Sequence, residues 1–390
     1  MTSAVAVAGR TGPWTPEPGF GVYVHIPFCR HRCHYCDFNT YEGLDSLHDA
    51  YVDALIDDIG RAEGDLPEAT SVFFGGGTPT LLPPAALGRI LGAIRARVGI
   101  APGAEVTVEA NPETVDEEGF ATLLGAGFNR TSIGVQSLVP NVLVALGRTH
   151  SPDVALEAID AARRSGFPDI SADLIFGSPW ETPDDWRTSL QGVIDAAPDH
   201  ISAYALTVEE GTPLATLVAT GRVPRIDPDI QAERYATACS LLSGAGYERY
   251  EISNWARPGR AGRHNVLYWS AGDYLGFGAG AHGHVSGRRS WRIRLPRDYV
   301  AAARAGRDTV AGAETVGAEA RACETLLCGL RLISGVDVIS FERRHPGYLA
   351  GRWSVVEDLA AAGMIELSGG RLRLSNRGVL LGDDVIARLA

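Results

Sequence analysis

The chain has 390 residues, a formal net charge of −12 and 45% hydrophobic residues, which is enough for a large buried core. All 35 basic residues are arginine, so Schiff-base, pyridoxal-phosphate and Walker A chemistry, which need a lysine amine, are excluded. The negative charge argues against nucleic acid as the main partner. No run of about 18 apolar residues is present and residues 1–19 lack a signal-peptide pattern, so we expect a cytoplasmic protein without a transmembrane segment.

Six short apolar runs alternate with amphipathic helical segments along the first half of the chain. The predicted strands are residues 22–26, 71–74, 105–109, 131–135, 170–175 and 201–206. The predicted helices are residues 47–59, 84–97, 114–126, 151–165 and 182–196. This alternation predicts an α/β fold in which helices cover a parallel sheet. Such a fold places its active site at the carboxyl ends of the strands.

Three cysteines follow the first predicted strand. Cys29, Cys33 and Cys36 have C-x3-C-x2-C spacing, and the next cysteine is Cys239. A structural metal site closes its coordination shell, whereas a catalytic site keeps one position open. Three thiolates on one loop therefore indicate an iron–sulfur cluster with one iron free to bind a substrate. The alternative is a partial zinc site or three unconnected thiols.

Glycines and a carboxylate follow the next two predicted strands. The glycine triplet at residues 75–77 comes after the second strand, and Glu109 ends the third. Backbone without a Cβ approaches a ligand closely, and a carboxylate at a strand end suits the hydroxyls of a ribose. The alternatives are a tight turn and an exposed carboxylate.

A second polar set comes from the fourth and fifth strands and the segment between them. It consists of Gln136, Arg148 and Asp173. Arginine offers a fork to a carboxylate, aspartate accepts from an ammonium or hydroxyl group, and glutamine does either. Asp173 lies within an apolar run, so its carboxylate needs a partner, either a ligand or Arg148.

The cysteine motif resembles that of the radical S-adenosylmethionine (SAM) enzymes. The resemblance implies a partial (β/α)6 barrel that stays laterally open, with a [4Fe-4S] cluster on Cys29, Cys33 and Cys36. In that family, the amino and carboxylate groups of SAM bind the fourth iron. An electron from the cluster then cleaves SAM to a 5'-deoxyadenosyl radical. The glycine triplet resembles the SAM-binding motif of the family.

Several motifs between residues 20 and 285 closely resemble the oxygen-independent coproporphyrinogen III oxidase family. They are H-I-P-F-C at 25–29, the cysteine triplet, the segment 75–80, G-V-Q at 134–136, L-G-R at 146–148 and D-L-I-F-G at 173–177. The resemblance implies that the SAM on the cluster contacts Tyr23, Gly76 and Glu109. It implies that a second SAM contacts Tyr35, Gly77, Thr78, Gln136, Arg148 and Asp173. Ala205 and His282 match SAM-contacting positions less closely.

Two departures favour the oxidase-like HemW branch, whose members resemble haem chaperones that pass haem to acceptor proteins. The oxidase family has a further cysteine two residues after the third, where this chain has Phe38, and a longer segment before the first strand. Residues 264–269 match the H-N-x-x-Y-W signature of that branch, which predicts haem binding by His264, Asn265, Tyr268 and Trp269. Imidazole ligates haem iron, and aromatic rings pack on a porphyrin. The alternative is a capped turn followed by core aromatics.

Arginines flank this signature on both sides. They are Arg257, Arg260 and Arg263, then Arg288, Arg289, Arg292, Arg294 and Arg297. Their guanidinium groups are candidates to pair with haem propionates or with an anionic membrane surface. The alternative is an ordinary solvated face.

Beyond about residue 315 the pattern changes to two helices, 321–334 and 353–362, and a hairpin at 364–374. These elements predict a small α+β winged-helix-like domain that acts as a lid or docking surface. The predicted division is a flexible tail at 1–19, a radical SAM core with the haem signature at 20–290, and a C-terminal domain at 291–390.

The sequence thus predicts a haem chaperone with a radical SAM fold, a [4Fe-4S] cluster and SAM. Its predicted partners are haem and a haem-accepting protein such as a respiratory enzyme. The enzymatic alternative is oxidative decarboxylation of coproporphyrinogen III to protoporphyrinogen IX. A third alternative is a cluster that only organises the fold or the interface of a homodimer.

Overall fold

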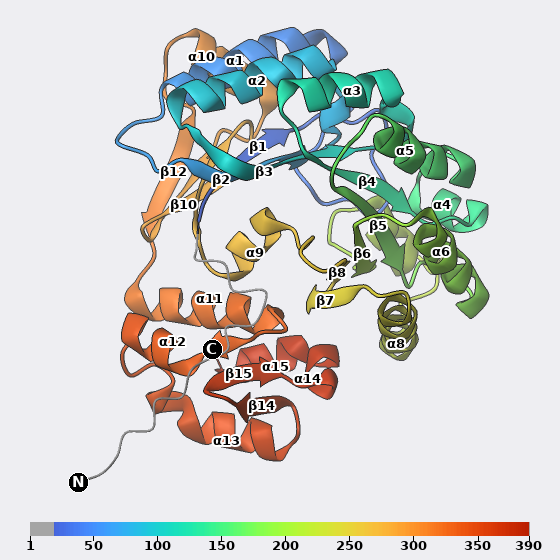
Figure 1. Ribbon diagram of the computed structural model, residues 1–390, viewed down its shortest axis with the longest axis vertical. Coiled ribbons are helices and arrows are strands. Elements are labelled where there is room, and N and C mark those ends of the chain that lie inside the picture. The colour runs from blue at the N-terminus through green and yellow to red at the C-terminus, as the bar shows by residue number, and fades with distance from the viewer. Residues whose placement is uncertain (1–18, 390) are drawn as a thin grey trace.

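A twelve-stranded sheet runs through the larger part of the computed structural model, which describes residues 19–389 (Figure 1). Its strand order is β12-β11-β10-β9-β1-β2-β3-β4-β5-β6-β8-β7. The parallel centre consists of β1 (Phe20–Ile26), β2 (Ala69–Gly76), β3 (Ile100–Ala110), β4 (Arg130–Gln136), β5 (Ile170–Phe176) and β6 (His200–Ala205). All six predicted strands are confirmed, so six adjacent carboxyl ends meet at one edge of the sheet.

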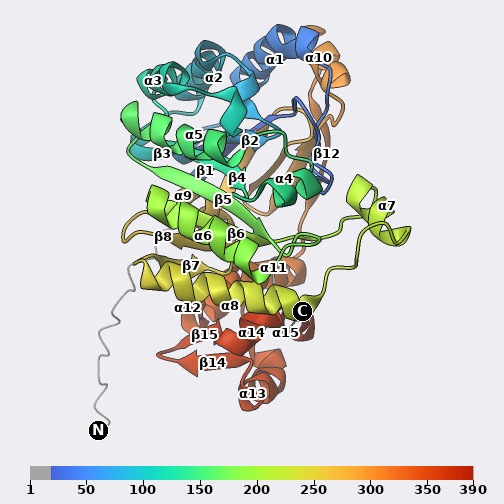
Figure 2. The ribbon, with the colours of Figure 1, turned by 90° about the vertical axis from the view of Figure 1, so that its right-hand side faces the viewer.

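Helices connect these strands and cover the outer face of the sheet (Figures 1 and 2). They are α1 (His48–Gly60), α2 (Pro84–Arg97), α3 (Glu117–Ala126), α4 (Pro140–Leu146), α5 (Pro152–Arg164) and α6 (Pro183–Ala196). In α1 the predicted stripe is buried at Tyr51, Leu55 and Ile59. Because the crossovers lie on one face, the other face lines an interior. The result is the predicted curved, laterally open barrel.

The sheet extends at both edges with short strands that the sequence does not predict. They are β7 (Glu248–Glu251), β8 (Asn254–Ala256), β9 (Asp273–Phe277), β10 (His282–Val285), β11 (Arg288–Arg292) and β12 (Val310–Thr315). β9 pairs parallel with β1, and the other five pair antiparallel. These strands are rich in glycine and charged residues, so they lack the apolar run that identifies a buried strand. The helices of this half are α7 (Pro213–Ala219), α8 (Pro228–Gly244), α9 (Arg263–Trp269) and α10 (Pro296–Arg304).

A buried carboxylate fixes this extension against α1. Asp58 is 4% exposed and accepts hydrogen bonds from Tyr299 Oη at 2.8 Å and Thr309 Oγ1 at 2.6 Å. Arg292 Nη1 lies 3.3 Å from Asp58 Oδ1. The three partners come from α10, the segment before β12, and β11, so one side chain joins three elements to α1.

A separate C-terminal unit lies below the barrel in Figure 1. Its sheet has the order β13-β15-β14, formed by β13 (Val336–Asp337), β15 (Arg371–Leu374) and β14 (Ile365–Ser368). Its helices are α11 (Ala318–Arg331), α12 (Val338–Arg344), α13 (Trp353–Ala361), α14 (Asn376–Leu380) and α15 (Gly382–Leu389). The hairpin turns at Gly369 and Gly370, whose φ angles of +58° and +75° suit glycine. The predicted small α+β domain is confirmed.

The predicted domain boundaries stay predictions. The tail at 1–19 lies outside the described residues except for Gly19. β12 still belongs to the large sheet, and the separate apolar core of the C-terminal unit begins at Ala322, so we propose that this unit starts after β12. Within residues 19–389, no helix combines the length and apolar character needed to cross a bilayer.

Replacing Asp58 with alanine should destabilise the barrel, because Arg292 then keeps a largely buried charge without its carboxylate. We expect the free energy of unfolding to fall by about 3 kcal/mol. The control is Asp57→Ala on the same helix, where the carboxylate is 56% exposed and 3.9 Å from Arg61; it should cost less than about 1 kcal/mol. Chemical denaturation followed by tryptophan fluorescence measures both. Equal effects of the two substitutions would show that Asp58 does not hold the extension.

Candidate functional site

The three cysteines lie on a loop that leaves the carboxyl end of β1. Backbone hydrogen bonds close this loop, from Cys29 N to Tyr41 O at 3.0 Å and from Tyr41 N to Pro27 O at 2.8 Å. His34 N donates to Leu146 O at 3.2 Å, which ties the loop to the end of α4. The loop is therefore held from two sides of the barrel mouth.

Each cysteine sulfur has a polar neighbour. Thr78 Oγ1 lies 4.0 Å from the sulfur of Cys29, Arg148 Nη1 lies 3.5 Å from that of Cys33, and Thr40 Oγ1 lies 3.8 Å from that of Cys36. Hydroxyl and guanidinium groups stabilise negative charge on sulfur, as metal-bound thiolates require. Burial raises the pKa of the Cys29 thiol to about 11, so metal binding must supply the drive for its deprotonation.

The three cysteines lie on one loop, as the predicted ligand set requires. In a cluster each thiolate would bind a different iron. The ligand set and the zinc alternative both stay predictions on this geometry.

The glycine triplet after β2 packs against the cysteine loop. Gly77 N donates to Ile26 O, and Thr78 N donates to Phe28 O, both at 2.8 Å. A Cβ on Gly77 would lie 2.5 Å from Phe28 O, and Gly76 has a φ of +112°. Glycine is thus required here by backbone packing. The predicted approach of a ligand to this edge stays a prediction.

A cavity of about 380 Å³ opens beside the cysteines, within the range of small-molecule sites. Along with the three cysteines, its lining includes eight of the predicted SAM-binding residues: Tyr35, Gly76, Gly77, Thr78, Glu109, Gln136, Arg148 and Asp173. Tyr23 lies deeper, with its hydroxyl 2.9 Å from His25 Nδ1. Ala205 also lines the cavity, whereas His282 does not. The strand ends therefore bring the predicted set together.

Asn111 belongs to this site, although it is not among the predicted ligand-binding residues. Its Oδ1 accepts from Arg148 Nη2 at 2.7 Å, and its Nδ2 donates to Thr78 Oγ1 at 3.0 Å. Arg148 Nη2 also donates to Gly134 O at 3.1 Å. Asn111 therefore connects the strand ends of β2, β3 and β4. Its position two residues after Glu109, at the end of a predicted strand, is the signal that could have found it.

The two carboxylates of the mouth have different partners. Asp173 accepts from Ser132 Oγ at 2.8 Å and Ser202 Oγ at 2.6 Å, so serines and not Arg148 satisfy it. Glu109 accepts from Gly76 N at 3.1 Å. Burial, and then the charge of Asp173, raises the pKa of Glu109 to about 8. Glu109 is therefore mostly protonated at neutral pH and can donate as well as accept a hydrogen bond.

Comparison with known proteins supplies the family. A profile of the Radical SAM superfamily matches residues 23–191, and a profile of the HemN C-terminal domain matches residues 317–381. The chain is 41% identical over 381 residues to the Heme chaperone HemW of Mycobacterium tuberculosis, covering 96% of each chain. It is 36% identical over 371 residues to the Heme chaperone HemW of Bacillus subtilis, covering 93% of this chain and 97% of the relative. The chain belongs to the HemW family of radical SAM proteins.

The HemW-family chain shares its fold with a solved oxidase. The coproporphyrinogen III oxidase of Escherichia coli, a radical SAM enzyme, superposes with a TM-score of 0.82 at 22% identity, covering 96% of this chain and 91% of that one. This likeness shows the radical SAM fold. The radical SAM domain implies a [4Fe-4S] cluster and SAM, which the cysteine loop and the adjacent cavity suit.

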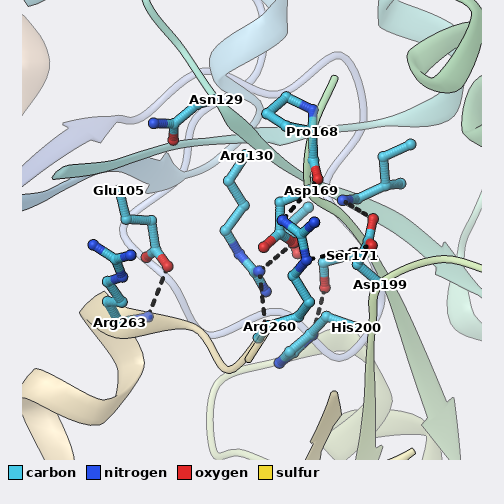
Figure 3. Close-up of polar contacts among 12 residues, drawn as sticks. Glu105, Asn129, Arg130, Pro168, Asp169, Ser171, Asp199, His200, Arg260 and Arg263 are labelled. Atoms are coloured by element: carbon cyan, nitrogen blue, oxygen red, sulfur yellow. Dashed lines mark hydrogen bonds and ion pairs between the residues drawn. The ribbon is translucent and has the colours of Figure 1, made fainter. Parts of the chain in front are cut away.

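The H-N-x-x-Y-W signature of the HemW-family chain lies at the opposite end of the barrel, on α9. Figure 3 shows Glu105 reaching the first turn of α9, where its carboxylate accepts from the backbone N–H of Arg263 at 2.7 Å. The same carboxylate also accepts from the backbone N–H of His264 at 3.0 Å. Arg130 pairs with Asp169 and also donates to the carbonyl of Arg260 in the loop before α9. These contacts hold α9 as a floor across the amino ends of the strands.

His264 is enclosed by this floor. Its Nδ1 lies 2.9 Å from Ser71 Oγ, and its ring stacks on Phe73 with centroids 5.3 Å apart. Its Nε2 is buried with no hydrogen-bond partner among the described residues. Burial lowers the pKa of His264 to about 3, so the ring is neutral, as a metal ligand must be. The cavity beside it measures only about 150 Å³, below the usual size of a ligand site, so a porphyrin does not fit without movement of α9.

The other signature residues also have structural partners. Asn265 Nδ2 donates to Tyr250 Oη at 3.0 Å, and the ring of Tyr268 stands edge-on to that of Tyr274 with centroids 4.7 Å apart. The guanidinium carbon of Arg331 on α11 lies 4.3 Å from the ring centroid of Trp269, which joins the floor to the C-terminal unit. Direct haem contacts by these residues stay predictions.

Most of the predicted propionate-binding arginines have internal partners. Arg257 lies over the ring of Tyr247 at 4.0 Å, Arg263 donates to Gly103 O at 2.7 Å, and Arg289 pairs with Glu324 at 2.7 Å. Arg260 and Arg292 pair with Asp199 and Asp58, respectively. Arg288, Arg294 and Arg297 are exposed. The guanidinium groups best placed to meet an external anion therefore lie on the β11–α10 side.

Cys36→Ser should abolish cluster binding, because the cluster then lacks a thiolate and SAM supplies no replacement. We expect iron in the anaerobically reconstituted protein to fall from about four atoms per chain to near zero. The matched control is Cys239→Ser in α8, which should retain full iron content. Iron and sulfide assays measure both variants. Full iron content in Cys36→Ser would refute the ligand assignment.

Glu109→Gln should make stability less sensitive to pH. In the folded state the pKa of Glu109 is about 8, whereas in the unfolded chain the pKa of a glutamate carboxyl is about 4.3. Between these values the folded state binds the extra proton, so the free energy of unfolding of the parent protein falls as pH rises. The amide removes this dependence, so the stability of the variant relative to the parent should rise by about 1 kcal/mol or more between pH 5 and pH 8.

Denaturant titrations across this pH range measure the difference. The control is Glu118→Gln on the exposed side of α3, which should follow the parent protein at every pH. Parallel pH profiles for Glu109→Gln and the parent would mean that Glu109 is ionised in the folded state.

Proposed function

We propose that this protein is a haem chaperone, which binds haem and passes it to an acceptor protein while carrying a [4Fe-4S] cluster and SAM. The observation that carries the proposal is the 41% identity, over 96% of each chain, to a relative named Heme chaperone HemW. Phe38 adds independent support, because the oxidase family has a cysteine where this chain has a phenylalanine that is 63% exposed.

The residues of the mouth divide into cluster ligands and SAM-orienting groups. Cys29, Cys33 and Cys36 would hold the cluster, which supplies single electrons when bound. Glu109 and the Arg148–Asn111 pair would orient SAM. Glu109 offers a protonated carboxyl to a ribose, and Arg148 offers a fork to the methionine carboxylate. This chain needs those groups whether SAM is cleaved or only bound.

The partners follow from the same proposal. The acceptor would be a haem-dependent respiratory enzyme, met in the cytoplasm or at the membrane surface. All six cysteines are unpaired, which suits a reducing compartment. The exposed guanidinium groups of Arg288, Arg294 and Arg297 suit an anionic surface of a membrane or of an acceptor. A homodimer is a further proposed assembly.

Oxidation of coproporphyrinogen III is the competing function. The structural likeness to the Escherichia coli oxidase concerns the fold alone at 22% identity. A decarboxylase must hold the propionate of its substrate beside the cluster-bound SAM. Here the region beside Cys36 presents the exposed ring of Phe38, which offers no hydrogen bond to a carboxylate.

The test compares the two functions in one preparation. The reconstituted protein is incubated anaerobically with haem, or with coproporphyrinogen III, SAM and a reductant. We expect about one haem per chain and no protoporphyrinogen IX, because Phe38 offers no hydrogen bond to hold a propionate for radical attack. Transfer of the bound haem to an apo-haemoprotein completes the support. Formation of protoporphyrinogen IX, or absence of haem binding, would refute the proposal.

A further inference from the structure

The cavity beside His264 extends through the barrel to the mouth. Its volume is about 150 Å³, and residues of α9 line one end of it. Four side chains line both this cavity and the larger one at the mouth: Glu109, Ser132, Asp173 and Tyr204. The predicted SAM site and the signature helix therefore face one interior space, and side chains within that space can connect them.

A chain of side-chain hydrogen bonds crosses this space. Ser171 Oγ on β5 lies 3.4 Å from Asp173 Oδ1 and 2.8 Å from His200 Nδ1, and Figure 3 shows the link to His200. His200 Nε2 lies 3.0 Å from Tyr250 Oη on β7. Tyr250 Oη accepts in turn from Asn265 Nδ2 of α9 at 3.0 Å. The chain therefore runs from a carboxylate of the mouth to the second residue of the signature.

His200, in the middle of the chain, is a neutral imidazole. It is buried, and burial, followed by the charge of Arg130, lowers the pKa of His200 well below its ordinary value. A neutral imidazole carries one N–H, on either nitrogen, and uses the other nitrogen as an acceptor. Because both nitrogens have hydrogen-bond partners here, the position of that one proton sets the direction of the hydrogen bonds from Tyr250 to Asp173.

The same distances allow two proton arrangements. In the first, Tyr250 donates to His200 Nε2, His200 Nδ1 donates to Ser171, and Ser171 donates to Asp173. In the second, Ser171 donates to His200 Nδ1, and His200 Nε2 donates to Tyr250. Both contain the same protons, and exchange with water moves the imidazole proton between the nitrogens. Asp173 accepts on both oxygens, as an ionised carboxylate does, and its charge favours the first arrangement.

The two arrangements differ in how firmly Tyr250 holds α9. In the first, its hydroxyl donates to His200 and accepts from Asn265. In the second, N–H groups of both residues point at one hydroxyl oxygen, so the hydrogen bond to Asn265 is weaker. The backbone of Tyr250 stays fixed, because its carbonyl accepts from Ile333 N at 3.0 Å. A porphyrin enters the floor only if α9 moves, so the second arrangement favours haem binding.

We propose that Ser171, His200 and Tyr250 form a hydrogen-bond relay through which SAM at Asp173 raises the affinity of α9 for haem. An ammonium or hydroxyl group of SAM donates to Asp173, the carboxylate no longer attracts the Ser171 proton, and the second arrangement loosens Asn265. The three relay residues are positioning residues that act through Asp173 and Asn265. This inference rests on the proposed haem chaperone function and on the predicted contact of Asp173 with SAM.

The experiment titrates haem into the cluster-loaded, full-length protein with and without saturating SAM. It is anaerobic and contains no reductant, so SAM stays intact. Soret difference spectra give the haem affinity, and isothermal titration calorimetry gives the SAM affinity. We expect SAM to tighten haem binding on the order of fivefold or more, and haem to tighten SAM binding by the same factor, because coupling between two sites is reciprocal.

Three variants locate the coupling within the chain. Ser171→Ala removes the link between Asp173 and His200, so SAM should no longer change its haem affinity. Tyr250→Phe removes the hydroxyl that holds Asn265, so it should bind haem without SAM as tightly as the parent protein does with SAM. The matched control is Ser202→Ala, which removes a hydroxyl that donates to the same Asp173 oxygen at 2.6 Å without being part of the relay. Its ratio of haem affinities with and without SAM should stay at the parental value.

Nitrogen NMR of protein with isotope-labelled histidine observes the relay without haem. The chemical shifts of the two ring nitrogens distinguish the Nδ1–H form from the Nε2–H form. The signals of His200 are assigned by their loss in His200→Asn. We expect the Nδ1–H form in the protein without SAM and the Nε2–H form after SAM is added.

The outcomes separate the relay from the proposed function. Coupling that is lost in Ser171→Ala and kept in Ser202→Ala, together with the change of the His200 proton, supports the relay. Haem affinity that SAM leaves unchanged or lowers overturns the relay but leaves the chaperone function in place. So does an equal loss of coupling in both serine variants, or a His200 proton that does not move. Absence of haem binding by the parent protein overturns the proposed function, and the relay with it.

Discussion

Hydrogen bonds that continue the β1–β2 pairing beyond both strands hold the mouth of this barrel in place. Gly77 N and Thr78 N donate to the carbonyls of Ile26 and Phe28, at 2.8 Å each, so the start of the cysteine loop lies against the glycine edge. A side chain on Gly77 would meet the Phe28 carbonyl and push the loop away. The missing Cβ of Gly77 thus lets Cys29 lie beside Thr78. Thr78 in turn binds Asn111, which binds Arg148, so this hydrogen-bond network also depends on the glycine.

The two ends of the barrel have opposite characters because they are closed differently. At the mouth, the sheet is laterally open, and a cavity of about 380 Å³ is lined by the cysteines and by polar groups from the strand ends. At the floor, the Glu105 carboxylate binds the first turn of α9, and Trp269 packs on Arg331 of the C-terminal unit. Breaking the floor would leave the buried carboxylate of Glu105 without the two backbone N–H groups of α9 that donate to it, which is costly. Ligand exchange is therefore easier at the mouth than at the floor.

The sequence predicts the centre of the fold and most of the mouth, because both depend on local patterns. The apolar runs identify β1 to β6, and parallel strand order then brings Glu109, Gln136 and Asp173 to one edge. The short strands β9 to β12 escape prediction because Arg288–Arg292 and its neighbours carry charge and glycine where a buried strand carries apolar residues. Pairing with β1 and with each other, not local propensity, makes them strands. Asn111 stands at a predicted strand end, but its hydrogen bond to Arg148 is formed only in the folded chain.

The signature motif shows how a sequence match and a structural position can point to different chemistry. The alternative to haem binding for residues 264–269 was a turn followed by packed aromatic rings. In this conformation, these side chains have such packing roles. Asn265 binds Tyr250, and Trp269 covers the seam to α11. Substitution of a residue that holds the floor can disturb the fold. Loss of haem binding in such a variant therefore does not by itself identify a haem ligand.

A chaperone must also release its cargo, and this requirement argues against a fully enclosed haem site. Ligation by His264 would enclose haem within the barrel, and each transfer would have to open the floor and expose Glu105 and Arg130. A site on the open side of the barrel would leave the haem accessible to the acceptor. Direct transfer between two proteins would avoid the cost of releasing a hydrophobic molecule into water. Exposure, which weakens a binding site, is thus an advantage for a protein whose task is transfer.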